Sequence, residues 1–344
     1  MIGREDRIRE YLPTAGITIQ VIQGTDVAVN EEFIYPLVKA MEIIEHYVNA
    51  WNPESELQSG LFRISIPLFD RRAFREALVN AVAHRDYAVL GRTRILIDDE
   101  GLTISSPGGF VEGVTLDNLL SVEPRARNPC LADALKRIGL AEKTGRGIDR
   151  IYEGSILYGR PWPDYSESDS TIVKLFIPRA DPDEAFTAMI IEEKNRLGRQ
   201  LPFNSLLILS ALKEERRADM RRIAEVTHLS PVKTKAALER LVETGLAEAI
   251  GDGRGRTYML SSNVYRKTAN ATEYVRQRDI NKIRQVPLIL QFVEVNGEIT
   301  KRDVADLLHV SDLQAYRILK SMVDNGYLRM IGARKVAKYV PAGK

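Results

Sequence analysis

The sequence contains one cysteine, Cys130, among 344 residues. A single thiol excludes an internal disulfide and a cysteine metal cluster, and it is typical of proteins of the reducing cytosol. We expect Cys130 to be a small buried apolar residue. No run of about 18 apolar residues is present, so no membrane span is expected. The charged residues 1–7 do not resemble a secretion signal.

Two further absences concern catalysis. The sequence has no G-x-x-x-x-G-K-[ST] phosphate loop and no second motor lobe, which argues against a helicase motor. The four histidines show no metal-ligand spacing, which argues against a histidine metal centre. They are His46, His84, His228 and His309.

Charge is distributed unevenly along the chain, although the net charge is only +2. Residues 201–344 hold 25 lysines and arginines against 16 acidic residues, a net charge of +9. Residues 1–200 hold 24 against 31, a net charge of −7. A basic half beside an acidic half predicts a polyanionic partner for the basic half.

Apolar residues recur at helical spacing from Phe74 to Val82, which predicts a core-facing helix over about residues 71–88. Glu76, Asn80 and His84 lie four residues apart and share a different face of that helix. A glutamate can polarise a water molecule, and an asparagine can offer its carbonyl oxygen to Mg²⁺. The alternative is an ordinary polar edge of the helix, because E-x-x-x-N is a weak motif.

The elements expected around this helix alternate between strand and helix. They predict an α+β fold, a mixed α/β layer with helices on one face. The expected strands are 16–26, 61–68, 93–97, 102–105 and 171–177, and the expected helices are 31–51, 128–138 and 146–158.

Prolines and charges in residues 178–183 indicate an exposed domain boundary. We therefore expect several parts along the chain. They are the N-terminal part of the α/β domain (1–69), the rest of that domain (70–180), a linker helix (181–203), two similar units (204–262 and 285–344) and a linker between these units (263–284).

The two similar units form an internal repeat with an offset of 81 residues. Residues 222–230 align with 303–311, and the alignment continues without a gap over about thirty residues. Each copy reads as three helices followed by a two-stranded wing. Ser230 is a natural N-cap for the third helix, and Gly245 stands where that helix must end. The pattern resembles a tandem pair of winged helix-turn-helix domains, which dock the third helix in the DNA major groove.

Cationic and hydrogen-bonding side chains gather on both third helices and both wings, and they are the candidate contacts to double-stranded DNA. In the first copy they are Lys233, Thr234, Lys235, Arg240, Arg254 and Arg256. In the second copy they are Gln314, Tyr316, Arg317, Lys320, Arg334, Lys335 and Lys338. The alternative is that the lysines only solvate a winged helix that binds protein.

Five phrases in residues 70–178 resemble the C-terminal module of RecG-type ATP-dependent DNA helicases. This module is found mainly in bacterial and archaeal transcriptional regulators and has the ATPase fold of gyrase, heat-shock chaperones and histidine kinases. The phrases are Arg75-Glu76-Ala77-Leu78-Val79-Asn80-Ala81, His84-Arg85-Asp86-Tyr87, Pro107-Gly108-Gly109, Arg127-Asn128-Pro129 and Gly145-Arg146-Gly147-Ile148. The family's N-terminal domain is usually larger, which leaves open whether this chain is a fragment.

The resemblance implies an ATP site with Mg²⁺. Glu76 would orient the attacking water as the catalytic residue, and Asn80 would hold the metal. The other nucleotide-binding residues would be Gly108 and Gly109 near the adenine, Arg127 and Asn128 in the lid, and Gly145, Arg146 and Gly147 near the phosphates.

One departure from the family concerns the adenine. Members place an aspartate in the first glycine motif, where it accepts a hydrogen bond from the adenine amino group. The sequence has Ser105 and Ser106 there, and neither provides a carboxylate. The departure favours weak, altered or lost nucleotide binding.

The leading hypothesis is a cytoplasmic DNA-binding transcriptional regulator, in which a degenerate or weak ATP-binding domain serves as sensor or scaffold. A nucleotide or another anion would be the effector, and palindromic DNA would require a homodimer. Two alternatives are an ATP-hydrolysing, helicase-related DNA enzyme and a protein-interaction adaptor.

Overall fold

The computed structural model describes residues 3–59, 62–141, 145–261, 264, 286–308 except 288, 291 and 295, 312–331 and 338–342. One compact unit comprises residues 1–211 with 221–241, and a second comprises residues 212–220 with 242–344. The boundary between the two units lies within residues 204–262.

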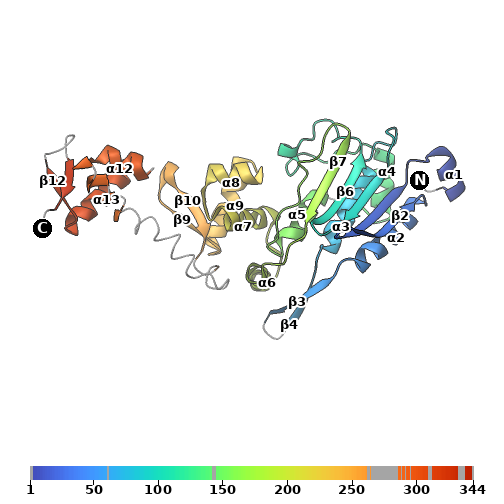
Figure 1. Ribbon diagram of the computed structural model, residues 1–344, viewed down its shortest axis with the longest axis horizontal. Helices are drawn as coiled ribbons and strands as arrows, with labels where there is room; N and C mark the ends of the chain where they lie inside the picture. Colours follow the sequence, from blue (N-terminus) through green and yellow to red (C-terminus); the bar gives the residue numbers. More distant parts are fainter. Residues whose placement is uncertain are drawn as a thin grey trace. The chain divides into compact units, whose positions relative to one another are not determined.

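A five-stranded sheet organises the first unit, in the order β2-β1-β5-β6-β7 (Figure 1). Its strands are β1 (Ile17–Gln23), β2 (Asp26–Phe33), β5 (Thr93–Ile97), β6 (Gly101–Pro107) and β7 (Ile172–Pro178). β1 and β5 pair in parallel and the other neighbours are antiparallel. Buried and more accessible residues alternate along β1, as expected for a sheet with one covered face.

The buried side chains of this sheet share one apolar core with α2 (Leu37–Ala50) and α3 (Arg71–Ala83). Ile19, Ile44 and Ile95 are completely buried in it. The prediction of a mixed α/β layer within an α+β fold is confirmed. α4 (Pro129–Arg137) and α5 (Gly147–Ile156) lie where the sequence predicts short helices.

The sequence-based boundaries are wrong at three places. Residues 31–33 belong to β2, and the helix starts only after Pro36, which is its N-cap. The polar segment of β3 (Glu54–Ser59) was not expected as a strand, yet it pairs with β4 (Phe62–Pro67) in a two-stranded hairpin. α3 ends at Ala83, several residues before the predicted end, and His84 is its C-cap.

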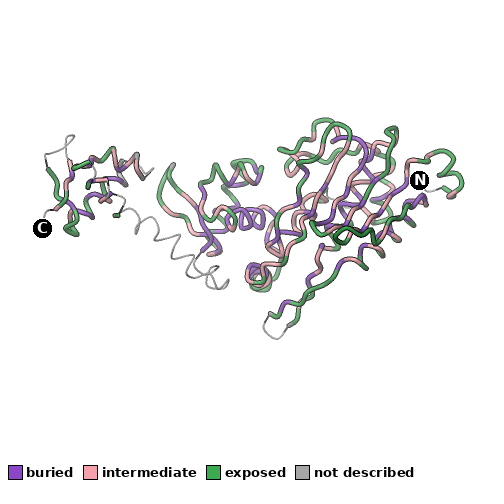
Figure 2. The backbone as a smooth tube through the Cα atoms, viewed as in Figure 1, coloured by how far each residue is buried: buried purple, intermediate pink, exposed green. Residues whose placement is uncertain are grey.

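Two helices follow the sheet. α6 (Glu184–Leu197) occupies the expected linker and packs Phe186, Met189 and Ile190 inward. α7 (Phe203–Glu215) is buried along most of its length, which the continuous purple stretch in Figure 2 shows. None of the helices in the described part of the chain is long and apolar enough to cross a membrane.

The 81-residue repeat is confirmed element by element. α8 (Met220–Thr227), α9 (Pro231–Glu243), β9 (Ala247–Ile250) and β10 (Thr257–Leu260) recur 81 residues later. Their counterparts are α12 (Lys301–Leu308), α13 (Asp312–Asp324), β12 (Leu328–Ile331) and β13 (Lys338–Pro341). Gly245 and Gly326 end the longer helices with nearly equal positive φ angles of 73° and 74°.

Each copy carries a three-stranded antiparallel sheet. The first has the order β8-β10-β9, with β8 at Arg217–Asp219, and the second has the order β11-β13-β12, with β11 at Ile299–Thr300. In the second copy Val304, Leu319 and Tyr339 share an apolar core. In each copy, the short strand that precedes the helix pair in the chain is hydrogen-bonded to the hairpin that follows the helix pair.

Candidate functional site

α3 and α5 cross in close contact because α5 has a glycine at the crossing. A Cβ atom on Gly154 would lie 2.5 Å from the Cβ atom of Ala73, well inside van der Waals contact. α3 itself begins at an N-cap, where the Asp70 carboxylate accepts hydrogen bonds from two backbone N–H groups. These contacts hold the last turn of α5 against the first turn of α3.

This crossing brings together three of the predicted nucleotide-site residues. A Cβ atom on Gly147 would lie 3.1 Å from Glu76 Oε2 and 3.4 Å from Asn80 Nδ2. Glu76 is buried, and its Oε1 lies 3.4 Å from Arg150 Nη1. Glu76, Asn80 and Gly147 therefore form one cluster, although 71 residues separate the first from the last. Arg150 belongs to this cluster and was not predicted.

The first turn of α5 carries its own carboxylates. Arg146 Nε lies 3.3 Å from Asp149 Oδ2, and Arg146 Nη2 lies 3.7 Å from Glu153 Oε1. Burial raises the pKa of Asp149, and the hydrogen bond from Arg146 opposes that shift. Burial also raises the pKa of Glu153. Arg146, a predicted phosphate ligand, thus pairs with carboxylates of its own helix, and it is absent from the wall of the adjoining cavity.

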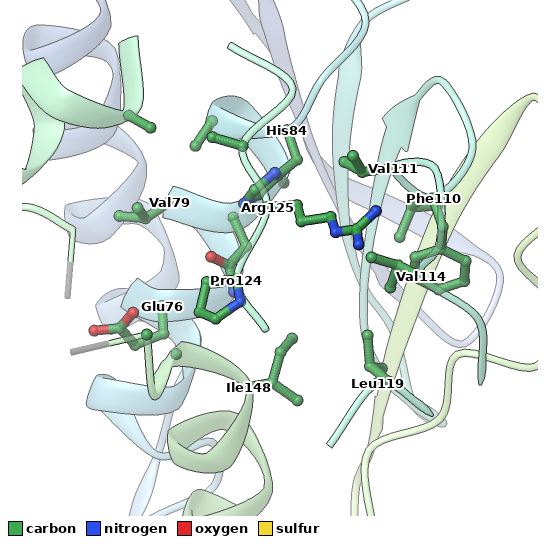
Figure 3. Close-up of a pocket in the computed structure, with 18 of the residues that line it drawn as sticks. Glu76, Val79, His84, Phe110, Val111, Val114, Leu119, Pro124, Arg125 and Ile148 are labelled. Atoms are coloured by element: carbon green, nitrogen blue, oxygen red, sulfur yellow. The ribbon is translucent and has the colours of Figure 1, made fainter. Parts of the chain in front are cut away.

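A cavity of about 280 Å³ adjoins this cluster. Figure 3 shows Glu76, Val79 and His84 on one side of it and Phe110 and Val111 on the other. Residues 110–125, which we call the cavity loop, supply much of the apolar wall. Their apolar contributions are Phe110, Val111, Val114, Leu119, Leu120, Val122 and Pro124. No pattern in the sequence predicted the contact of this apolar loop with the site.

The glycines of the first motif, Gly108 and Gly109, allow close packing and also line the cavity. Gly108 has φ +92°, and a Cβ atom on it would lie 2.5 Å from the Cβ atom of Asp86. The N–H groups of Gly108 and Gly109 donate to the carbonyls of Thr171 and Ser170. Both glycines line the cavity, but their N–H groups already have acceptors. They extend the pairing of β6 with β7 beyond the strand ends.

Ser106, at the position of the family aspartate, is turned toward α3. Its hydroxyl is buried and donates to the carbonyl of Ala81 over 2.6 Å. This bond uses its only proton and fixes the hydroxyl against the helix. Ser106 therefore joins β6 to α3 and still lines the cavity, where its oxygen can accept a hydrogen bond but supplies no carboxylate.

Arg127 and Asn128, the predicted lid residues, make hydrogen bonds within the protein in this structure. Arg127 donates to Asp86 Oδ2 over 3.1 Å and to the carbonyl of Gly109 over 2.6 Å. Asn128 Nδ2 donates to the carbonyls of Ala83 and Arg85. Neither residue lines the cavity. Together they clamp the end of α3 to the first glycine motif, because α3 leaves carbonyls there without helical partners.

His84 and Arg85 lie at this clamped helix end. Burial lowers the pKa of His84, and the positive charges of Arg127 and Lys136 lower it further. The Nδ1 atom of His84 is buried without a hydrogen-bond partner among the described residues. Arg85 is buried and donates to the carbonyls of Thr14 and Gly91. A neutral imidazole thus faces the cavity, while Arg85 ties three segments of the unit together.

The candidate DNA contacts on α9 divide into two groups. Lys233, Lys235 and Arg240 are exposed to solvent. Thr234 is completely buried, and its hydroxyl donates to the carbonyl of Ser230 over 3.1 Å. Its prediction as a DNA contact is therefore wrong. The Ser230 hydroxyl accepts from the N–H group of Lys233 at the start of α9, so Ser230 is the N-cap that the sequence predicts.

The remaining candidate DNA contacts fall into three groups: exposed, ion-paired and outside the described residues. Arg256, Tyr316, Arg317 and Lys320 are exposed. Lys338 is half-buried, and its Nζ atom lies 2.6 Å from Glu298 Oε1, so its charge is already paired. Arg334 and Lys335 lie outside the described residues, as do the side chains of Arg254 and Gln314.

Comparison with known proteins identifies the module around the cavity. Residues 92–176 match the family model "Putative ATP-dependent DNA helicase recG C-terminal". The match covers the predicted phrases at Gly108, Arg127 and Gly147, and it begins after α3. An ATPase-like domain of the RecG C-terminal type is thus present in the chain. No curated protein matches the sequence.

One solved structure is similar over most of the chain. The crystal structure of the DIP2311 protein from Corynebacterium diphtheriae aligns with a TM-score of 0.62 at 19% sequence identity. The alignment covers 96% of this chain and 59% of that one, so this chain spans little more than half the length of the similar protein. At this identity the likeness concerns the fold.

The ATPase-like domain fits a magnesium–phosphate group better than it fits an adenine. Asn80 offers an amide oxygen beside Gly147, at the start of a helix whose positive end attracts anions. Glu76 and Asp149 are carboxylates at the same end, so a phosphate group there would need a cation to offset repulsion. Toward the base, Ser106 supplies no carboxylate. The residues present therefore fit the phosphate end of a nucleotide without a carboxylate to match the adenine.

Proposed function

We propose that this chain is a DNA-binding transcriptional regulator and that its ATPase-like domain acts as scaffold or sensor. The observation that carries the proposal is the exposed cationic face of α9, formed by Lys233, Lys235 and Arg240. A solvent-exposed helix with three cations is complementary to the phosphate backbone of duplex DNA. The net charge of +9 on residues 201–344 extends the same preference over that half of the chain.

The repeat supports this proposal. In both copies a short strand, a helix pair and a two-stranded hairpin follow one another at identical spacing. This is the element order of a winged helix-turn-helix domain, in which the second helix of the pair enters the major groove. Arg317 and Lys320 on α13 are exposed as the cations of α9 are. Two such units in one chain would read a site in two adjacent parts, and a palindromic site would require a homodimer.

A sensor role draws support from contacts within the first unit. Asp117, in the cavity loop, has its Oδ1 atom 3.9 Å from Nδ1 of His228, which precedes α9. The positive charge of Lys233 on α9 also lowers the pKa of Asp149, which lines the cavity. A ligand that moved the cavity loop would thus act on groups beside the DNA-reading helix. Magnesium-bound nucleotide or another anion is the proposed effector.

The second candidate function is an ATP-hydrolysing DNA enzyme, favoured by the helicase name of the matched family. The pairing of Glu76 with Arg150 and the position of Ser106 weigh against it. DNA-stimulated ATP turnover by the purified chain would favour the enzyme over the regulator. Duplex binding without turnover would favour the regulator.

The test of the proposal is retention of the full chain on random duplex DNA in an electrophoretic or filter assay. Salt would be varied from about 50 to 200 mM, a range in which several phosphate contacts reduce affinity by orders of magnitude. We expect salt-dependent retention, and binding of selected sequences above the random background. Absence of retention at the lowest salt would contradict the proposal. The protein-interaction adaptor would then be the remaining alternative.

A further inference from the structure

α9 carries an exposed apolar residue where its solvent-facing side would be expected to be polar. Val232 is 79% exposed in the first turn of the helix, between Pro231 and Lys233. A β-branched apolar side chain contributes nothing to an exposed helix through propensity or burial. The other side of the helix already supplies the core contacts, through Ala237, Leu238 and Leu241. Val232 is thus available for a contact outside the chain.

The neighbours of Val232 form an ordered surface, which we call the reading face. Val232 and Ala236 are both exposed and lie one turn apart, so they occupy the middle of the solvent-facing side. Lys233 and Arg240 lie seven residues apart along one border of that side. Lys235 lies along the other border, with its Nζ atom 3.8 Å from Glu239 Oε1. Val232 and Ala236 are therefore flanked by cations on both sides, and the exposed Glu239 follows them in the next turn of the same face.

This arrangement matches the major groove in both charge and chemistry. The groove is bordered by two phosphate backbones, and its floor presents base edges that include the 5-methyl group of thymine. In a helix-turn-helix the N-terminal residues of the reading helix contact those edges, and Val232 is in the first turn of α9. Alanine and other small apolar side chains make the contacts that favour thymine over cytosine.

We propose that Val232, with Ala236 beside it, is a specificity-determining residue that contacts a thymine 5-methyl group in the DNA site. The inference rests on the proposed DNA-binding function and adds the base that α9 selects. The second copy has Leu313 at the position of Val232 but Arg317 at that of Ala236, so only α9 has two apolar residues one turn apart on this face. The apolar contact is assigned to α9 alone.

The experiment uses the full chain and a duplex obtained by selection from random sequences. Each thymine of the selected site is replaced singly by deoxyuridine, which removes only the 5-methyl group. We expect the wild-type chain to lose about three- to tenfold in affinity at one or two thymines, as for the loss of one good base contact. The variant Val232→Ser should lose a similar factor on the thymine site and show no further loss with deoxyuridine there.

A matched control is available on the same helix. Val242 is also an exposed valine of α9, but it lies in the last turn, away from the N-terminal residues. Val242→Ser should retain both the affinity and the sensitivity to deoxyuridine, and circular dichroism should show unchanged helix content in both variants. Sequence-selective binding that tolerates deoxyuridine at every position would overturn the inference and leave DNA binding intact. Absence of any selective binding would overturn the inference together with the proposed function.

Discussion

Arg150 Nη1 lies 3.4 Å from Glu76 Oε1, so the carboxylate that the family resemblance marks as catalytic is paired with a cation of the neighbouring helix. The two side chains differ in exposure, since 8% of the Glu76 side chain and 38% of the Arg150 side chain are accessible. The pair therefore links α3 and α5 at the end of the cavity. It offsets only part of the negative charge that would repel a phosphate group there.

Loss of this pair should cost stability. In Arg150→Met, Glu76 would lose a charge partner while staying buried, and we expect a loss of about 1–3 kcal/mol in the free energy of unfolding. The measurement is urea unfolding followed by circular dichroism. Arg146→Met is the matched control, because Arg146 pairs with carboxylates from a more exposed position and should cost at most about 1 kcal/mol. Equal losses in the two variants would show that burial of Glu76 does not raise the free-energy cost of removing its ion pair.

The close crossing of α3 and α5 yields a second prediction. Gly154→Ala would place a Cβ atom 2.5 Å from Ala73, so α5 must shift or the variant loses about 1–3 kcal/mol. The thermal unfolding midpoint is the measurement. Gly255→Ala serves as control, because no atom lies within 4 Å of the added Cβ there. A Gly154→Ala variant as stable as the control would mean that the crossing is loose.

His84 predicts a pH dependence of stability. Its pKa is lowered in the fold, so the unfolded chain binds more protons than the folded chain below the ordinary value of 6.5. The stabilisation from its neutral form is therefore present above pH 6.5 and is lost as the pH falls toward the lowered pKa. We expect wild-type stability to decline as the pH falls below about 6.5, and His84→Gln to flatten that decline. His46→Gln, which changes a histidine outside the cavity, should leave the decline unchanged.

Nucleotide binding should be weak and dependent on magnesium. Glu76 and Asp149 face the phosphate end, and Ser106 provides no carboxylate for adenine. Millimolar Mg-ATP should raise the unfolding free energy by about 1 kcal/mol or less, as expected when ligand concentration is close to Kd. ATP with EDTA should have no effect. A large shift without magnesium would contradict the arrangement of charges described above.

Local pattern was enough to predict many elements of the fold. The apolar stripe from Phe74 to Val82 correctly predicts α3, and the repeat correctly predicts both copies of the helix pair. The pattern fails where pairing partners are distant in sequence. β3 is polar and has no β-branched residue, so only its register with β4 reveals it as a strand. The helix start at Leu37 depends on Pro36 and on a neighbouring strand.

The candidate site was also only partly predictable from the sequence, because local spacing is visible there and distant contacts are not. The spacing of Glu76 and Asn80 indicated their shared helix face, but no local signal reveals Arg150 as their neighbour. Thr234 reads as a polar surface residue, yet its hydroxyl bonds within its own helix, so the side chain can be buried.

Contacts distant in sequence also set the surroundings of Arg127 and Asn128. The two side chains reach carbonyls and a carboxylate 18 to 45 residues away, contacts that a motif alone does not reveal. Cys130 is exposed and not buried as expected, because it lies in the first turn of a short surface helix.

The most direct test of the central claim is the salt dependence of duplex binding by the full chain, compared with the triple variant Lys233→Ala, Lys235→Ala and Arg240→Ala. We expect the variant to reduce the slope of log affinity against log salt by about two to three units, close to one for each lost phosphate contact. Lys338→Ala is the control, because Lys338 is held 2.6 Å from Glu298, much closer than the 3.8 Å between Lys235 and Glu239, and the slope should change little. An unchanged slope in the triple variant would contradict the claim that α9 meets DNA through its cationic face.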